Sequence, residues 1–169
     1  DIVGFLKSPP LGSTLLMTTF GLNERVLVDL LKKAGIPAQQ KIVVAHDVYR
    51  RNNPGYLKYY FPNSVVITVT LPTTERHSVP AFHAKLWGYV DSENRRFIRL
   101  AISSINLTET HLAKASNSLE SWYVLKNVSF DKSDTLSRLL QTDSGRNLKE
   151  CVVNMPACTF LVDTRNSNE

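Results

Sequence analysis

Residues 14–46 hold the pattern that most constrains the fold of this chain: two apolar runs separated by an amphipathic helical repeat. Residues 14–20 are almost continuously apolar, which is typical of a strand that is buried on both faces. Residues 41–46 form a second run of the same kind. A strand, a helix and a strand in this order predict a βαβ unit, whose connection is almost always right-handed. We therefore expect an α/β protein.

Local signals predict where the helix of this unit begins and ends. Residues 21–23 are the expected turn, and the side chain of Asn23 can cap a helix that begins at Glu24. Gly35 and Pro37 are expected to end the helix. Between these limits, apolar residues recur at helical spacing at positions 26, 27, 30, 31 and 34.

Residues 82–89 and 99–108 predict a further pair of strands. Both runs alternate in polarity or are rich in apolar residues, and polar segments bound them. Residues 91–94 are the expected hairpin turn between the two strands. The two runs are therefore expected to lie side by side in the sheet.

Polar residues recur at alternate positions of these two strands. Because side chains alternate between the faces of a strand, His83 and Lys85 are expected to share one face. By the same rule, Ser104 and Asn106 share a face of the second strand. An imidazole, an ammonium, a hydroxyl and a carboxamide would then meet at one end of the sheet. Such a set of groups suits a phosphoryl group.

This arrangement resembles the catalytic half-motif of the phospholipase D superfamily. The resemblance lies in His83-x-Lys85 on one strand and in the Ser-x-Asn-Leu-Thr run that begins at Ser104. The common form of the motif also carries an Asp a few residues after the Lys, but Asp91 lies one position too far along and in the expected turn. This difference, together with the 23 positions between His83 and Asn106, favours the branch typified by tyrosyl-DNA phosphodiesterase.

The resemblance implies both a fold and a mechanism. The fold is a phospholipase D-like α/β sandwich, with a mixed central sheet flanked by helices, of which residues 12–145 supply one motif-bearing half. In the implied mechanism, His83 attacks the phosphorus and holds the phosphoryl group as a phosphohistidine. Lys85 and Asn106 donate to the phosphoryl oxygens. Because these groups take the place of a metal ion, the resemblance implies no metal and no cofactor.

Glu120 and Ser104 each have two interpretations. Glu120 lies 14 positions after Asn106, where the family has an acidic or amide residue that contacts an active-site imidazole. A carboxylate there can fix the tautomer of His83 or of a second histidine. The alternative is a surface charge at the start of a strand. Ser104 either hydrogen-bonds the phosphate or satisfies local backbone groups.

The other histidines are assigned separately. His46 ends a buried strand and is interpreted as a structural residue of the core. His111 follows Asn106 on an expected short helix and is expected to be exposed. His77, in the loop before His83, is a candidate for contact with the substrate.

The charge of the chain favours polyanionic partners. It has 20 Lys and Arg residues against 15 Asp and Glu residues, a net charge of +5. Residues 47–63 interleave basic and aromatic side chains, a composition that can bind phosphates and stack bases. The candidate nucleic-acid contacts are Arg50, Arg51, Lys58, Arg95, Arg96 and His77. The alternative for residues 55–61 is an amphipathic helix that packs Leu57, Tyr60 and Phe61 inward.

No metal site is predicted. Cys151 and Cys158 have no His or acidic cluster between them, and two thiolates cannot complete a tetrahedral site. We expect both to be reduced core residues. The sequence also lacks an apolar run long enough to span a bilayer.

At 169 residues, the chain is expected to form a single domain over residues 1–169. It begins at Asp1 instead of Met, and we interpret it as a segment of a longer or processed protein. The remaining expected elements are an arm over residues 1–12, strands over 65–71, 120–125 and 157–162, and helices over 108–115 and 133–140.

Two classes of function remain open. The first is a metal-independent phosphodiesterase or nuclease that acts on nucleic acid, with DNA favoured over RNA; a phospholipid-cleaving enzyme is a variant of this class. The second is a nucleic-acid-binding module of a larger protein, with little or no catalysis of its own. The superfamily mechanism uses a second histidine to protonate the leaving group, but this chain has a single His-x-Lys. The second imidazole is expected from a homodimer partner, from a motif-bearing half outside this chain, or not at all, and the homodimer is slightly favoured.

Overall fold

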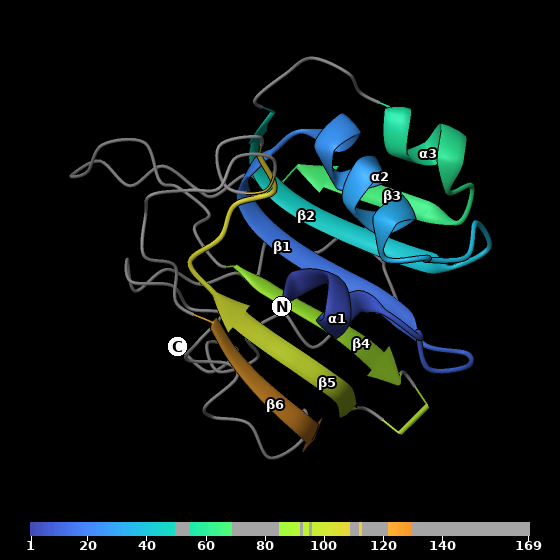
Figure 1. Ribbon diagram of the computed structural model, residues 1–169, viewed down its shortest axis with the longest axis vertical. Coiled ribbons are helices and arrows are strands. Elements are labelled where there is room, and N and C mark those ends of the chain that lie inside the picture. The colour runs from blue at the N-terminus through green and yellow to red at the C-terminus, as the bar shows by residue number, and fades with distance from the viewer. Residues whose placement is uncertain are drawn as a thin grey trace, which may run out of the picture.

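The computed structural model describes residues 1–49, 55–68, 85–91, 93–94, 96–108, 112 and 122–129. Within these residues, six strands form one mixed sheet in the order β3-β2-β1-β4-β5-β6 (Figure 1). The strands are β1 (Thr14–Leu22), β2 (Lys41–Tyr49), β3 (Ser64–Thr68), β4 (Leu86–Asp91), β5 (Arg96–Ser103) and β6 (Trp122–Ser129). The helices of this part of the chain are α1 (Ile2–Leu6), α2 (Glu24–Lys33) and α3 (Tyr56–Tyr60). The mixed α/β class expected from the sequence is therefore confirmed.

The βαβ unit predicted for residues 14–46 is present as β1, α2 and β2, and the two strands pair in parallel. β1 continues through Gly21 and Leu22, so the prediction that these two residues form a turn was wrong. Leu22 is buried and forms a parallel bridge with Leu107. Gly21 and Leu22 also pair with Val48 and Tyr49 at the end of β2, and this pairing with a neighbouring strand prolongs β1 beyond the end that the local pattern indicates.

The predicted ends of α2 are confirmed. The Asn23 side-chain oxygen accepts hydrogen bonds from the backbone N–H groups of Arg25 and Val26, which have no partner within the helix. Gly35 follows the last turn with a φ of 69°, a left-handed conformation that favours glycine. The helix buries one face against the sheet through Val26, Leu27, Val28 and Leu31.

The expected arm over residues 1–12 contains the short helix α1, so that prediction was incomplete. Asp1 caps α1 by accepting a hydrogen bond from the backbone N–H of Gly4. Phe5 and Leu6 are buried in the core, and the Tyr89 hydroxyl donates to the Leu6 carbonyl oxygen. These contacts with β4 hold a helix that is too short to be stable alone.

The amphipathic helix considered for residues 55–61 is present as α3, over Tyr56–Tyr60. Leu57 and Phe61 are buried as predicted, whereas Tyr60 is only partly buried against the core. Glu24 of α2 is also buried, and its carboxylate accepts hydrogen bonds from the backbone N–H groups of Gly55 and Leu57, at 3.3 and 2.6 Å. Glu24, the first residue of α2, thus also provides acceptors for backbone N–H groups at the start of α3.

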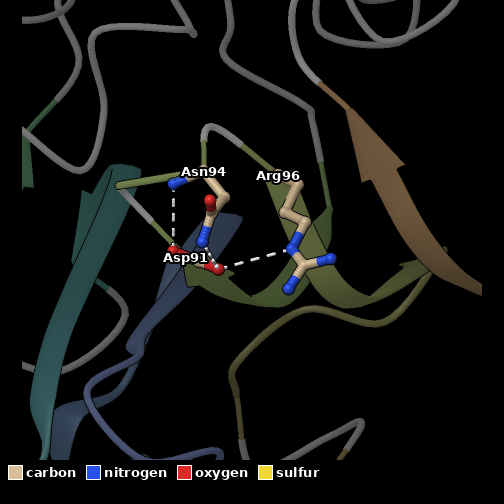
Figure 2. Close-up of polar contacts among 3 residues, drawn as sticks. All are labelled: Asp91, Asn94 and Arg96. Carbon is tan, nitrogen blue, oxygen red and sulfur yellow. Dashed lines mark hydrogen bonds and ion pairs between the residues drawn. The ribbon is translucent and has the colours of Figure 1, made fainter.

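The predicted hairpin is formed by β4 and β5, which pair antiparallel. Asp91 is the last residue of β4, and its carboxylate accepts hydrogen bonds from the backbone N–H and the side-chain amide of Asn94, at 3.1 and 2.8 Å (Figure 2). Arg96, the first residue of β5, contributes an ion pair to the same carboxylate at 3.3 Å. These contacts lower the pKa of Asp91, with Asn94 contributing most. The turn is therefore closed by its own side chains.

Several predicted boundaries differ from the structure. β5 ends at Ser103, so the expectation that the strand runs on to residue 108, with Ser104 and Asn106 in it, was wrong. β3 begins at Ser64, and β6 spans Trp122–Ser129 where a strand over residues 120–125 was predicted. In the predicted helix over residues 108–115, the Leu112 N–H donates to the Thr108 carbonyl oxygen, at 3.0 Å. The expected elements over residues 133–140 and 157–162, with Cys151 and Cys158, lie outside the described residues.

One face of the sheet packs against α1, α2 and α3 (Figure 1). On this face Leu15 lies opposite Ile42 of β2 and Tyr89 of β4, and all three are fully buried. On the opposite face, Leu16 and Leu100 are buried as well, as expected for continuous apolar runs. A complete sandwich with flanking helices stays a prediction. In the described part of the chain, no helix is both long and apolar enough to cross a membrane.

Candidate functional site

The directions of the strands bring the ends of several strands to one edge of the sheet. β1, β2 and β3 are parallel, β4 is antiparallel to β1, and β5 is antiparallel to β4. The carboxyl ends of β1, β2, β3 and β5 therefore share an edge with the amino end of β4. We call this edge the carboxyl edge of the sheet.

Lys85 lies at the amino end of β4, on the carboxyl edge. The ladder between β1 and β4 stops at Met17, and beyond it the Thr18 hydroxyl accepts a hydrogen bond from the Leu86 backbone N–H, at 2.8 Å. On the other side, the Ser103 N–H donates to the Lys85 carbonyl oxygen at 3.0 Å. The start of β4 is thus held by both neighbouring strands, and Lys85 is half-buried between them.

Residues 104–107 cross the amino end of β4 as the chain passes from β5 to β1 (Figure 1). The Ser103 hydroxyl begins the crossing by accepting a hydrogen bond from the Ile105 backbone N–H, at 3.1 Å. The crossing ends where Leu107 bridges Leu22 and accepts a hydrogen bond from the Asn23 N–H, at 2.8 Å. This route carries Asn106 from β5 to the end of β1, close to the point where β4 begins.

The carboxamide of Asn106 is oriented by the end of β1. Its Oδ1 accepts from the backbone N–H groups of Phe20 and Gly21, at 3.2 and 3.5 Å, and lies 3.3 Å from the Thr19 hydroxyl oxygen. Because a backbone N–H can only donate, the atom that faces it must be the oxygen, which settles the choice between Oδ1 and Nδ2. Nδ2 makes no hydrogen bond to any described residue. It is the half of the amide that can donate to a ligand.

Three polar residues that lie side by side near the carboxyl ends of β1, β2 and β3 were not predicted as a group from the sequence. Thr68, His46 and Thr19 are register partners across β3, β2 and β1. His46 is fully buried, and its Nε2 lies 3.2 Å from the Thr68 hydroxyl oxygen, as expected for a core histidine. The signal in the sequence was the pair Thr18 and Thr19, two hydroxyls within an otherwise apolar strand.

Among the predicted catalytic residues, the structure brings Lys85, Ser104 and Asn106 to the carboxyl edge. Ser104 is exposed and directly follows β5, so it belongs to the crossing segment and not to the strand. His83 and Glu120 lie outside the described residues. Asp91, at the opposite end of β4 from Lys85, is not part of this group.

Two of the predicted nucleic-acid contacts lie in the described part of the chain, and neither is at the carboxyl edge. Arg96 begins β5, whose two ends are roughly 24 Å apart at the usual rise per residue. The Lys58 ammonium donates to the carbonyl oxygen of Ser64, the first residue of β3, at 3.1 Å. Both cations therefore lie toward the edge opposite Lys85 and Asn106. The other candidates, Arg50, Arg51, His77 and Arg95, lie outside the described residues.

Within the described ranges, no three His, Cys, Asp or Glu side chains are grouped closely enough to hold a metal ion. The predicted site residues at the carboxyl edge supply an ammonium, a carboxamide and a hydroxyl, which bind anions by donating hydrogen bonds.

Comparison with known proteins gives structural matches only. No protein-family model matches the chain, and no curated protein matches it. Yeast tyrosyl-DNA phosphodiesterase matches with a TM-score of 0.42 and 16% identity, over 68% of this chain and 26% of that one. A point mutant of yeast tyrosyl-DNA phosphodiesterase 1 matches with a TM-score of 0.44 and 15% identity, over 74% of this chain and 28% of that one. The chain thus spans about a quarter of the length of these proteins. Similarity at this level establishes neither family nor activity.

Proposed function

We propose that this protein cleaves phosphodiester bonds of nucleic acid without a metal ion, through a phosphohistidine formed on His83. The observation that carries the proposal is the oriented carboxamide of Asn106. Its oxygen accepts hydrogen bonds from β1, and its NH₂ group, which makes no hydrogen bond to a described residue, can donate near the start of β4, where Lys85 lies. An amide donor and an ammonium together can bind the oxygens of one phosphoryl group.

Covalent geometry supports the role of His83 in this proposal. His83 precedes Lys85 by two residues. Two residues of chain span at most about 7 Å, so the His83 Cα lies within that distance of the Lys85 Cα in any conformation. An imidazole on this segment can therefore reach a phosphoryl group that Lys85 binds.

The chemistry requires a neutral nucleophile and strong donors. A phosphodiester carries a negative charge that repels anionic nucleophiles, whereas a neutral imidazole nitrogen is not repelled. As the N–P bond forms and the bond from phosphorus to the leaving oxygen breaks, charge develops on the phosphoryl oxygens. In the proposed site, Lys85 and Asn106 stabilise this charge, and Ser104 adds a hydroxyl donor.

The cycle closes by hydrolysis. The leaving oxygen takes a proton from a general acid and departs as an alcohol. Water then attacks the phosphorus, the N–P bond breaks, and the water's proton returns to a base, so His83 is regenerated neutral. Glu120 is the proposed partner that fixes the His83 tautomer. The net charge of +5 favours a polyanionic substrate such as DNA.

The test is cleavage of labelled single-stranded DNA, double-stranded DNA, RNA and phospholipid vesicles, each in the presence of EDTA. We expect cleavage of nucleic acid in EDTA, and a loss of at least about a hundredfold in His83→Ala and in Lys85→Ala. Asn106→Asp should lose a similar factor while remaining folded, because a carboxylate still accepts from Phe20 and Gly21 but cannot donate.

Lys41→Ala is the matched control for Lys85→Ala, because Lys41 is exposed at the amino end of β2, on the opposite edge. It should cleave at the wild-type rate. Wild-type activity in His83→Ala, or a strict need for a metal ion, would refute the mechanism. Binding of nucleic acid without cleavage would instead support the binding-module alternative.

A further inference from the structure

Thr19 is a buried residue whose hydroxyl contacts three groups at the end of β1. Its side chain has no exposed surface. The hydroxyl oxygen accepts a hydrogen bond from the Leu107 backbone N–H at 3.0 Å. It also lies 2.9 Å from the Gly21 carbonyl oxygen and 3.3 Å from Asn106 Oδ1. Because a hydroxyl carries one proton, the nearer Gly21 carbonyl oxygen is its main acceptor and Asn106 Oδ1 the weaker one.

These contacts join β1 to the segment that carries Asn106. The two backbone N–H groups that reach Asn106 Oδ1 do so at 3.2 and 3.5 Å, which are long hydrogen bonds. The Thr19 hydroxyl lies at a similar distance from the same oxygen, 3.3 Å. Its shorter contact with this segment is the hydrogen bond that it accepts from the backbone N–H of the next residue, Leu107, at 3.0 Å.

We propose that Thr19 is a positioning residue of the site: its hydroxyl holds the backbone next to Asn106 against the end of β1 and thereby sets the position from which Nδ2 donates. This inference rests on the proposed function. Since Thr19 is fully buried, it acts through Asn106 and does not touch the substrate. Removing the hydroxyl leaves the buried Leu107 N–H without this acceptor, so a loss of stability should accompany the loss of kcat, and the two must be measured separately.

The first test compares Thr19→Val with Thr19→Ser. Valine has nearly the shape of threonine but lacks the hydroxyl, whereas serine keeps it. We expect Thr19→Val to lower kcat about tenfold or more with KM changed less than about twofold, because the lost interaction acts in the transition state. Thr19→Ser should restore kcat to within about threefold of the wild type.

A double-mutant cycle separates positioning from general structural damage. If Thr19 acts through Asn106, Thr19→Val should have no further effect on kcat when Asn106→Ala is already present. If Thr19 merely supports the fold, the same loss should appear in both backgrounds. Thr14→Val, at the other end of β1 and also buried, is the matched control and should leave kcat unchanged.

Should Thr19→Val not fold, Thr19→Ser and Thr19→Ala make the same comparison, because both remove the methyl group and only serine keeps the hydroxyl. Wild-type kcat in a folded hydroxyl-free variant, or additive losses in the cycle, would overturn the inference and leave the proposed function standing. A wild-type protein that is inert on every nucleic acid would overturn both.

Discussion

Tyr89 is buried in β4 and contacts two other elements. Its hydroxyl bonds to α1, and its ring packs against Arg99 of β5. The hydroxyl donates to the Leu6 carbonyl oxygen at the end of α1, and the Arg99 guanidinium carbon lies 4.5 Å from the centre of the ring. Arg99 also donates to the carbonyl oxygens of Lys7 and Ser8, at 2.6 and 3.0 Å. Burial raises the pKa of Tyr89 to about 12, although the Arg99 charge opposes this shift. The pair ties α1 to the sheet.

Tyr89 should make stability depend on alkaline pH. Its folded-state pKa of about 12 exceeds the unfolded value of 10.0, so the folded state retains the proton to higher pH. The stabilisation is complete below pH 10 and is lost as pH rises toward 12. This loss amounts to about 2–3 kcal/mol. Urea unfolding of the wild type and of Tyr89→Phe at pH 9 and pH 11.5 measures it: the advantage of the wild type should shrink at the higher pH. Parallel pH dependences would contradict the assignment.

At the scale of the element, β4 depends on the small size of Gly88. A Cβ atom added at Gly88 would lie 2.6 Å from the Phe97 ring and 3.0 Å from the Arg99 carbonyl oxygen. Phe97 has no exposed surface, and it belongs to β5, which pairs with β4. The glycine therefore allows the Phe97 ring of the neighbouring strand to approach the backbone of β4 closely.

Gly88→Ala should destabilise the hairpin by overpacking. The Cβ must displace a ring or a strand that has no free space, at a cost of about 1–3 kcal/mol. Thermal unfolding measures the loss. The control is Gly88→Ala combined with Phe97→Leu, which removes the ring and should recover part of the stability relative to the sum of the single changes. An unchanged melting temperature in Gly88→Ala would contradict this prediction, because it would mean that β4 and β5 accommodate the added Cβ without a loss of stability.

At the scale of the whole molecule, the candidate site is assembled from the end of β1, the start of β4 and the crossing segment after β5. The proposed mechanism still requires a general acid for the leaving group. His83 is followed two positions later by Lys, whereas His46, His77 and His111 are not. A second copy of the motif is therefore expected from another subunit.

We predict that the active form is a twofold homodimer, in which equivalent His83 side chains face one groove. Specific activity should then rise with protein concentration as the dimer forms. Light scattering measured on the same samples gives the mass. An inert monomer would favour a second motif-bearing half outside this chain. A fully active monomer would refute both ideas and direct the search for the acid to His77, Glu120 and solvent.

The sequence by itself determined those features that depend on neighbours a few residues apart. Strand and helix periodicity defined the βαβ unit of residues 14–46, and Asn23 and Gly35 marked the ends of α2. The hairpin of β4 and β5 followed from two apolar runs and a polar turn that closes on Asp91. Caps, turns and side-chain alternation act over short distances along the chain, so a local pattern is sufficient to predict them.

Only the tertiary structure decided which of the predicted site residues lie at the same edge of the sheet. The side-chain oxygen of Asn106 is contacted by Thr19, Phe20 and Gly21, which lie 85 to 87 positions before it in the sequence. Strand pairing likewise placed Lys58, which donates to the carbonyl oxygen of Ser64 at the start of β3, toward the opposite end of the sheet from Lys85. The physical reason is that sheet order and strand direction arise from long-range hydrogen bonding and burial, which no local pattern encodes.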